Sequence, residues 1–193
     1  SVKLVKPINF RNIDKVSILD FMENMKRFKI NSNFAVAVSG GPDSLALMLL
    51  SNEYANHLDI KMTVICIDHN LRKDSSSEVE WVRKQAWKLG AHFVTVKIPK
   101  KNLKSNLMSY ARDARYKELY KICSKKQIKS LLTAHHLDDE IENFLMRLVR
   151  GSGIKGLSSL KEKSMVNNNK LMLVRPLLKL SLIHISEPTR RTT

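Results

Sequence analysis

The feature that most constrains the fold is an alternation of short apolar, β-branched runs with longer segments of helical period. The runs expected to form strands cover residues 33–38, 62–67, 91–96, 130–134 and 171–174. The expected helices cover residues 14–28, 45–54, 78–89, 105–126 and 137–149. Strands that alternate with helices predict an α/β fold, a parallel sheet with helices packed on both faces.

Polar clusters directly follow three of the expected strands, at residues 39–44, 68–69 and 135–139. In open parallel sheets, ligands bind outside the carboxyl ends of the strands, near the point where strand order reverses. The sequence therefore predicts a binding site at this edge.

The first cluster is typical of a phosphate-binding loop, and its residues are Ser39-Gly40-Gly41-Pro42-Asp43-Ser44. The two glycines can take positive φ and let backbone amides approach an anion, and the proline suits the first position of a helix whose positive end faces the loop. The two serines add hydroxyl donors. Asp43 is interpreted as a Mg²⁺ ligand or as a helix cap. No Walker-type string is present, so we expect a phosphate cradle of another kind.

The third cluster places carboxylates near the same edge. Asp139 and Glu142 lie about 60° apart on one helix face and can converge on a cation or an amine, and His135 precedes them. The alternatives are a solvated acidic helix start and a metal site formed by the histidine pair at 135–136 with Asp139. The Gly-x-Gly-x-x-Gly string at residues 151–156 follows a helix, so it predicts a loop that contacts phosphate through Arg150 rather than a dinucleotide site.

Basic residues indicate a polyanionic partner. The chain carries 34 Lys and Arg against 18 Asp and Glu, a formal charge of +16, and residues 97–129 hold eleven of the cations with two acids. Arg112 and Arg115, three apart on a helix, suit contacts to nucleic-acid phosphates. The tyrosines nearby are expected either to stack on a base or to pack in the core, and they are Tyr110, Tyr116 and Tyr120.

Two further features concern the compartment. No apolar run approaches the roughly 20 residues of a membrane span, so we expect a cytoplasmic protein without a membrane partner. Cys66 and Cys123 belong to no metal-binding pattern and are expected to be buried, reduced thiols.

Taken in order, the motifs resemble the PP-loop ATP pyrophosphatase superfamily and, within it, the tRNA(Ile)-lysidine synthetase family. The resemblance covers about residues 34–179, and its motifs occupy residues 39–44, 68–72, 111–116, 134–143, 150–157 and 175–178. It implies a Rossmann-like sheet of the adenine nucleotide alpha hydrolase type, and a catalytic domain over residues 1–181 that includes the N-terminal helix. The atypical tail at 182–193 does not resemble the family's continuation, and we interpret it as a truncation or a foreign junction.

The resemblance also implies a reaction. ATP adenylates the C2 carbonyl oxygen of the wobble cytidine in an isoleucine tRNA with a CAU anticodon, and free L-lysine then displaces AMP. The positions implied for catalysis are Asp139, Glu142, His135 and Arg115. Those implied for ATP and Mg²⁺ are Ser39, Gly40, Gly41, Pro42, Asp43, Ser44 and His69, with Asp43 on the metal. Arg112 and Arg150 are expected from their charge and position to contact the tRNA.

Other functions stay open at this point. A tRNA 2-thiolation enzyme of the same superfamily would also adenylate a base. A non-catalytic, basic nucleic-acid-binding domain would explain the charge but not the phosphate cradle, and an amidotransferase-linked synthetase would explain the cradle but not the charge. A homodimer is kept as a hypothesis for the assembly.

Overall fold

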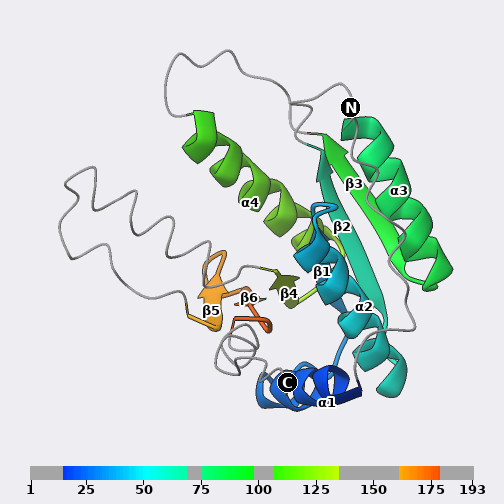
Figure 1. The fold of residues 1–193 in the computed structure, drawn as a ribbon. Helices are drawn as coiled ribbons and strands as arrows, with labels where there is room; N and C mark the ends of the chain where they lie inside the picture. The colour runs from blue at the N-terminus through cyan, green and yellow to red at the C-terminus, as the bar shows by residue number, and fades with distance from the viewer. Residues whose placement is uncertain (1–14, 69–74, 98–106, 135–160, 179–193) are drawn as a thin grey trace, which may run out of the picture.

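A computed structural model of the chain describes residues 15–68, 75–97, 107–134 and 161–178 (Figure 1). Its helices are α1 Lys15–Arg27, α2 Pro42–His57, α3 Ser75–Lys88 and α4 Leu107–Lys125. Its strands are β1 Phe34–Val38, β2 Met62–Asp68, β3 His92–Lys97, β4 Ser130–Thr133, β5 Lys163–Val166 and β6 Leu171–Val174. The expected helix at 137–149 and the tail at 182–193 lie outside the described residues.

The six strands form one sheet in the order β3-β2-β1-β4-β6-β5. All neighbours are parallel except β5, which runs antiparallel to β6. The predicted α/β fold with a parallel sheet is therefore confirmed. From β1 the chain builds outward through β2 to β3 and then returns to the other side of β1 as β4, so the strand order reverses between β1 and β4.

The helices that the structure describes lie on both faces of the sheet. Leu47 of α2, Val82 of α3 and Phe21 of α1 share one buried cluster with Val36 of β1. On the other face, Leu119 of α4 belongs to a second cluster. This division follows from right-handed crossovers, because the return connection from β3 to β4 must place its helix on the opposite face. Figure 1 shows α4 separated by the sheet from α2 and α3.

The helix α2 is apolar around most of its circumference, and ten of its sixteen residues are buried. Such a helix lies between a sheet and another layer, and here it packs between β1 and α1. Across the part of the chain that the structure describes, no helix has both the length and the apolar character that crossing a membrane would require.

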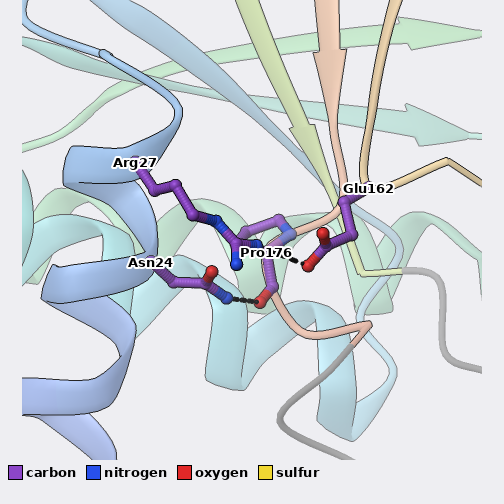
Figure 2. Close-up of polar contacts among 4 residues, drawn as sticks. All are labelled: Asn24, Arg27, Glu162 and Pro176. Atoms are coloured by element: carbon purple, nitrogen blue, oxygen red, sulfur yellow. Dashed lines mark hydrogen bonds and ion pairs between the residues drawn. The ribbon is translucent and has the colours of Figure 1, made fainter.

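Helix α1 contacts both the residue before β5 and the segment that follows β6 (Figure 2). Asn24 donates a hydrogen bond from Nδ2 to the carbonyl oxygen of Pro176 at 2.8 Å, and Arg27 forms an ion pair with Glu162 at 2.7 Å. The buried Phe21 and Met25 of α1 lie in the same apolar cluster as Leu177. The hydrogen bond to Pro176 therefore joins parts of the chain about 150 positions apart in sequence.

The strand β5 was not expected. Its residues Lys163–Val166 alternate between exposed and half-buried positions, so no apolar run marks them. The turn that joins it to β6 contains three consecutive asparagines, which all have positive φ (Asn167, Asn168 and Asn169). Asparagine adopts this left-handed conformation more readily than most residues. The turn returns the chain antiparallel at the edge of the sheet.

Leu47→Ala tests the double-sided burial of α2. Leu47 is fully buried in the cluster that α2 shares with β1 and α1, so its truncation should lower the free energy of unfolding by about 2–5 kcal/mol. The matched control is Leu19→Ala on α1, whose side chain is 66% exposed, and it should change stability by less than about 0.5 kcal/mol. Urea denaturation followed by circular dichroism measures both, and equal effects would contradict the packing described.

Candidate functional site

The predicted phosphate loop leaves β1 at Ser39 and enters α2 at Pro42. Gly40 has a φ of +89°, a conformation that L side chains rarely adopt. Gly41 precedes the helix with φ −70° and ψ 158°, which any residue can take. The expectation of positive φ is therefore confirmed at Gly40 and wrong at Gly41, because Gly41 serves as the extended residue before the helix. Pro42 occupies the start of α2 as predicted.

Hydroxyl hydrogen bonds fix the shape of this loop. Ser44 Oγ donates to the carbonyl oxygen of Gly41 at 2.9 Å. It accepts from the backbone N–H of Ser39 at 3.2 Å and from Ser39 Oγ at 3.3 Å. A serine hydroxyl has one proton to donate, so a bound anion would take either hydroxyl proton only by replacing one of these bonds. The loop is thus held in shape by the same groups that could contact a ligand.

Asp43 lies in the first turn of α2. Its interpretation as the helix cap is wrong, because Gly41 is the N-cap residue and makes no side-chain capping bond. The side chain is exposed, and a carboxylate in the first turn interacts favourably with the helix dipole. Its interpretation as a Mg²⁺ ligand stays a prediction.

A cavity of about 180 Å³ opens beside the loop, at the carboxyl ends of β1, β2 and β4. It lies at the reversal of strand order, where ligands are expected in such sheets. Ser39 and Ser44 line it from the loop, and Arg115 lines it from α4. Of the described residues that line the cavity, Arg115 carries a formal charge and none is a carboxylate. The positive end of α2, the loop and a guanidinium therefore suit an anionic ligand.

Two tyrosines of α4 were expected either to stack on a base or to pack in the core. Tyr116 and Tyr120 pack against the buried cluster under α4, with their ring centroids 5.8 Å apart, so the packing interpretation is confirmed for this pair. The guanidinium of Arg115 lies over the Tyr116 ring at 5.6 Å from its centroid. This contact orients Arg115 beside the cavity.

Several predicted site residues cannot be placed. His69, His135, Asp139, Glu142 and Arg150 lie outside the described residues. The side chain of Arg112 is likewise not described, although its backbone belongs to α4. Among the residues that are described, no three His, Cys, Asp or Glu side chains gather as a metal site.

The cavity also has lining residues that sequence reasoning missed. Thr133 and Ala134 at the end of β4 and Ile65 and Ile67 of β2 contribute to its wall. Thr133 and Ala134 lie at the carboxyl end of an expected strand, and this position could have marked them as site residues. Placing them beside the phosphate loop also required the pairing of β4 with β1, which the sequence does not reveal.

Both cysteines are buried, as expected. Burial raises the pKa of the Cys123 thiol to about 12. Burial likewise raises the pKa of Cys66 to about 12, and the nearby carboxylates of Asp68 and Glu78 contribute in the same direction. The two thiols belong to clusters on opposite faces of the sheet. They are therefore protonated at neutral pH and separated from each other.

A glycine-bearing phosphate loop between β1 and α2, in a sheet with this strand order, defines a nucleotide-binding α/β domain. The family model described as PP-loop domain matches residues 12–192. The chain belongs to this family, which confirms the superfamily resemblance of the sequence.

The chain is similar to curated proteins named tRNA(Ile)-lysidine synthase. It is 46% identical over 147 residues to that of Rickettsia bellii strain OSU 85-389, which covers 76% of this chain and 33% of the relative. It is 38% identical over 167 residues to that of Orientia tsutsugamushi strain Boryong, with 86% of this chain and 37% of the relative covered. The chain thus spans about a third of the length of the curated relatives it matches.

Among solved structures, the chain is similar to the U34-tRNA thiolase NcsA from Methanococcus maripaludis, solved with its 4Fe-4S cluster. The TM-score is 0.67 at 19% sequence identity, over 92% of this chain and 68% of that chain. At this identity the likeness supports the fold alone, and it agrees with the Rossmann-like sheet expected from the sequence.

Gly40→Ala tests the loop conformation. Alanine at a φ of +89° should cost about 1–2 kcal/mol of stability through backbone strain, because no atom except Val82 Cγ2, at 3.7 Å, lies near the added Cβ. The strain should distort the phosphate loop and weaken ATP binding about tenfold. The control is Gly90→Ala, where φ is +71° and nothing lies within 4 Å. It should cost similar stability and leave the ATP affinity, measured by calorimetry, unchanged; equal affinities in the two variants would contradict the role of the loop.

The cysteine pKa values predict a pH dependence. In native protein at pH 8, iodoacetamide should label neither thiol, whereas urea-unfolded protein should gain two adducts by mass spectrometry. The ordinary pKa of a cysteine thiol is 9.0. Above this pH the unfolded chain loses the two thiol protons, whereas the folded chain keeps them up to about pH 12. The free energy of unfolding should therefore fall as pH rises through this range. The Cys66→Ala/Cys123→Ala variant should lose less stability between pH 8 and pH 10, and fast labelling of native protein would contradict the burial.

Proposed function

We propose that the chain is the catalytic part of an ATP-dependent ligase that joins lysine to C2 of the wobble cytidine in an isoleucine tRNA with a CAU anticodon. The observation that carries the proposal is the cavity at the strand reversal, where Ser39, Ser44 and Arg115 come together. The names of the curated relatives supply the substrate class. The formal charge of +16 suits a nucleic-acid substrate.

In the first step, the C2 carbonyl oxygen of the cytidine attacks the α-phosphorus of ATP. An oxygen–phosphorus bond forms, the bond to the β-phosphate breaks, and pyrophosphate leaves. The residues of the loop, 39–44, would hold the phosphates through backbone amides and hydroxyls, and the Arg115 guanidinium would offset the charge that develops there.

In the second step, the ε-amine of lysine attacks C2 and AMP leaves with its oxygen. The amine must lose a proton to attack, so a carboxylate or His135 is a sensible base. In this proposal Asp139 and Glu142 hold the lysine ammonium and His69 lies near the adenosine, while Arg112 and Arg150 contact the tRNA. These roles rest on the motifs of the sequence.

The described residues fit a Mg²⁺ ion bound mainly by phosphates. Mg²⁺ in nucleotide sites takes one or two carboxylates together with phosphate oxygens and waters. Asp43, an exposed carboxylate beside the phosphate loop, would supply one ligand. The ion would neutralise charge on the leaving pyrophosphate.

Thiolation is less well supported than ligation. Iron–sulfur clusters are held by several cysteine thiolates, and this chain has two cysteines, buried in separate clusters with pKa values raised to about 12. A non-catalytic RNA-binding module would not need the phosphate loop.

The test incubates the protein with ATP, Mg²⁺, lysine and a CAU-anticodon isoleucine tRNA transcript, followed by mass spectrometry of the digested nucleosides. Lysine-dependent mass gain on cytidine, with release of AMP and pyrophosphate, is the expected result. ATP turnover without that gain would contradict the proposal.

Arg115→Met tests the cationic group in the cavity. Methionine keeps an unbranched apolar side chain beside Tyr116 but removes the charge. The rate of adenylation should fall about 10- to 100-fold, because that is the rate effect of losing one charge-assisted hydrogen bond in the transition state. The matched control is Arg83→Met on α3, whose guanidinium pairs with Glu80 and lies over Trp87 on the far face. ATP–pyrophosphate exchange in the presence of tRNA measures both rates, and equal rates would exclude Arg115 from the reaction.

A further inference from the structure

A second cavity, of about 510 Å³, lies at the opposite end of the sheet from the phosphate loop. It lies between the last turns of α4 and the turn that joins β5 to β6. Lys129 and Lys170 precede β4 and β6 directly, so they mark the amino edge of the sheet. The side chains that matter for its chemistry are Tyr120, Ser124, Gln127, Lys129, Asn167 and Lys170.

The two chain segments around this cavity carry positive charge alone. Residues 120–130 and 163–171 together contain six lysines and no Asp or Glu. All six lysines are exposed (Lys121, Lys125, Lys126, Lys129, Lys163 and Lys170). The nearest carboxylate along α4, that of Glu118, is within 3.7 Å of Lys121 Nζ. The region therefore presents concentrated positive charge to solvent.

Beside the apolar Cys123, Ile128 and Leu171 at its base, this cavity is lined by uncharged side chains that form hydrogen bonds. The turn between β5 and β6 exposes three successive asparagine carboxamides at residues 167–169, and Ser124 and Gln127 add a hydroxyl and an amide. Lysines with amide and hydroxyl donors are the set that contacts phosphate and sugar in nucleic-acid complexes.

One helix lines both cavities. Tyr116 borders the phosphate-loop cavity and Tyr120 borders the second one, and their rings are in contact at 5.8 Å between centroids. From Tyr116 to Ser124 the helix rises about 12 Å. A single RNA molecule can therefore reach from one cavity to the other along α4.

We infer that this second cavity, together with the surrounding lysines, is a docking groove for the phosphate backbone of the RNA substrate. The inference rests on the proposed function for the identity of the RNA, and the groove contacts phosphates at a distance from the reacting base. Backbone contacts of this kind set affinity and orientation rather than sequence choice.

The test replaces the two lysines at the groove, as Lys129→Gln/Lys170→Gln. The control, Lys84→Gln/Lys88→Gln, removes the same charge from exposed positions of α3 on the other face. A fluorescent CAU-anticodon isoleucine tRNA transcript is titrated by anisotropy across a salt series. The groove variant should bind about tenfold more weakly at low salt, and its slope of log affinity against log salt should be shallower by about 2. The control should match the parent in slope, and ATP affinity should be unchanged in both variants.

Equal losses in the two variants, or an unchanged slope in the groove variant, would overturn the groove. A groove-dependent affinity for poly-glutamate without one for tRNA would also overturn it, in favour of an acidic protein partner. The parent protein's lysidine assay separates the two proposals. If the parent forms lysidine but the groove variant binds tRNA as tightly as the parent, only the groove proposal is wrong. If the groove variant binds tRNA more weakly but the parent forms no lysidine, only the proposed reaction is wrong.

Discussion

The double pairing of β1 is the constraint on which the other features depend. Residues 34–38 pair in parallel with β2 on one side and with β4 on the other, so this strand has no free edge and both its faces lie in the core. Parallel strands in this position must be apolar throughout. The same pairing separates the crossover helices onto two faces and leaves the carboxyl end of β1 beside that of β4. The cavity next to Ser39 exists because these two ends meet.

The apolar runs made most of the sheet predictable. Strands buried on both faces leave a nearly continuous apolar run in the sequence, as residues 64–67 of β2 do, and α2 is apolar around most of its circumference. The edge strand Lys163–Val166 leaves no such signal, because its alternating exposed residues are also typical of a loop. Its existence depends on backbone pairing with β6, a long-range property that local patterns do not encode.

The local chemistry of the site could be predicted from the sequence, but the long-range arrangement of its residues could not. The chemistry of the loop at 39–44 followed from its residue types, and the positive φ of Gly40 followed from its place between strand and helix. The same reasoning failed at Gly41, because only one left-handed residue is needed to enter this helix. Arg115 was selected by helical spacing and motif resemblance, but its meeting with Ser44, 71 positions earlier, required the strand order. Where Asp139 and Glu142 lie relative to this cavity stays a prediction.

The contact between α1 and the segment after β6 has a consequence for synthesis on the ribosome. Pro176 and Leu177, which α1 contacts or packs with, are translated about 150 residues after Asn24. Helix α1 is therefore synthesised long before the segment that completes its packing. Its apolar face, with Phe21 and Met25, stays incompletely covered until that segment has been made, and exposed apolar surface on a nascent chain is what chaperones bind.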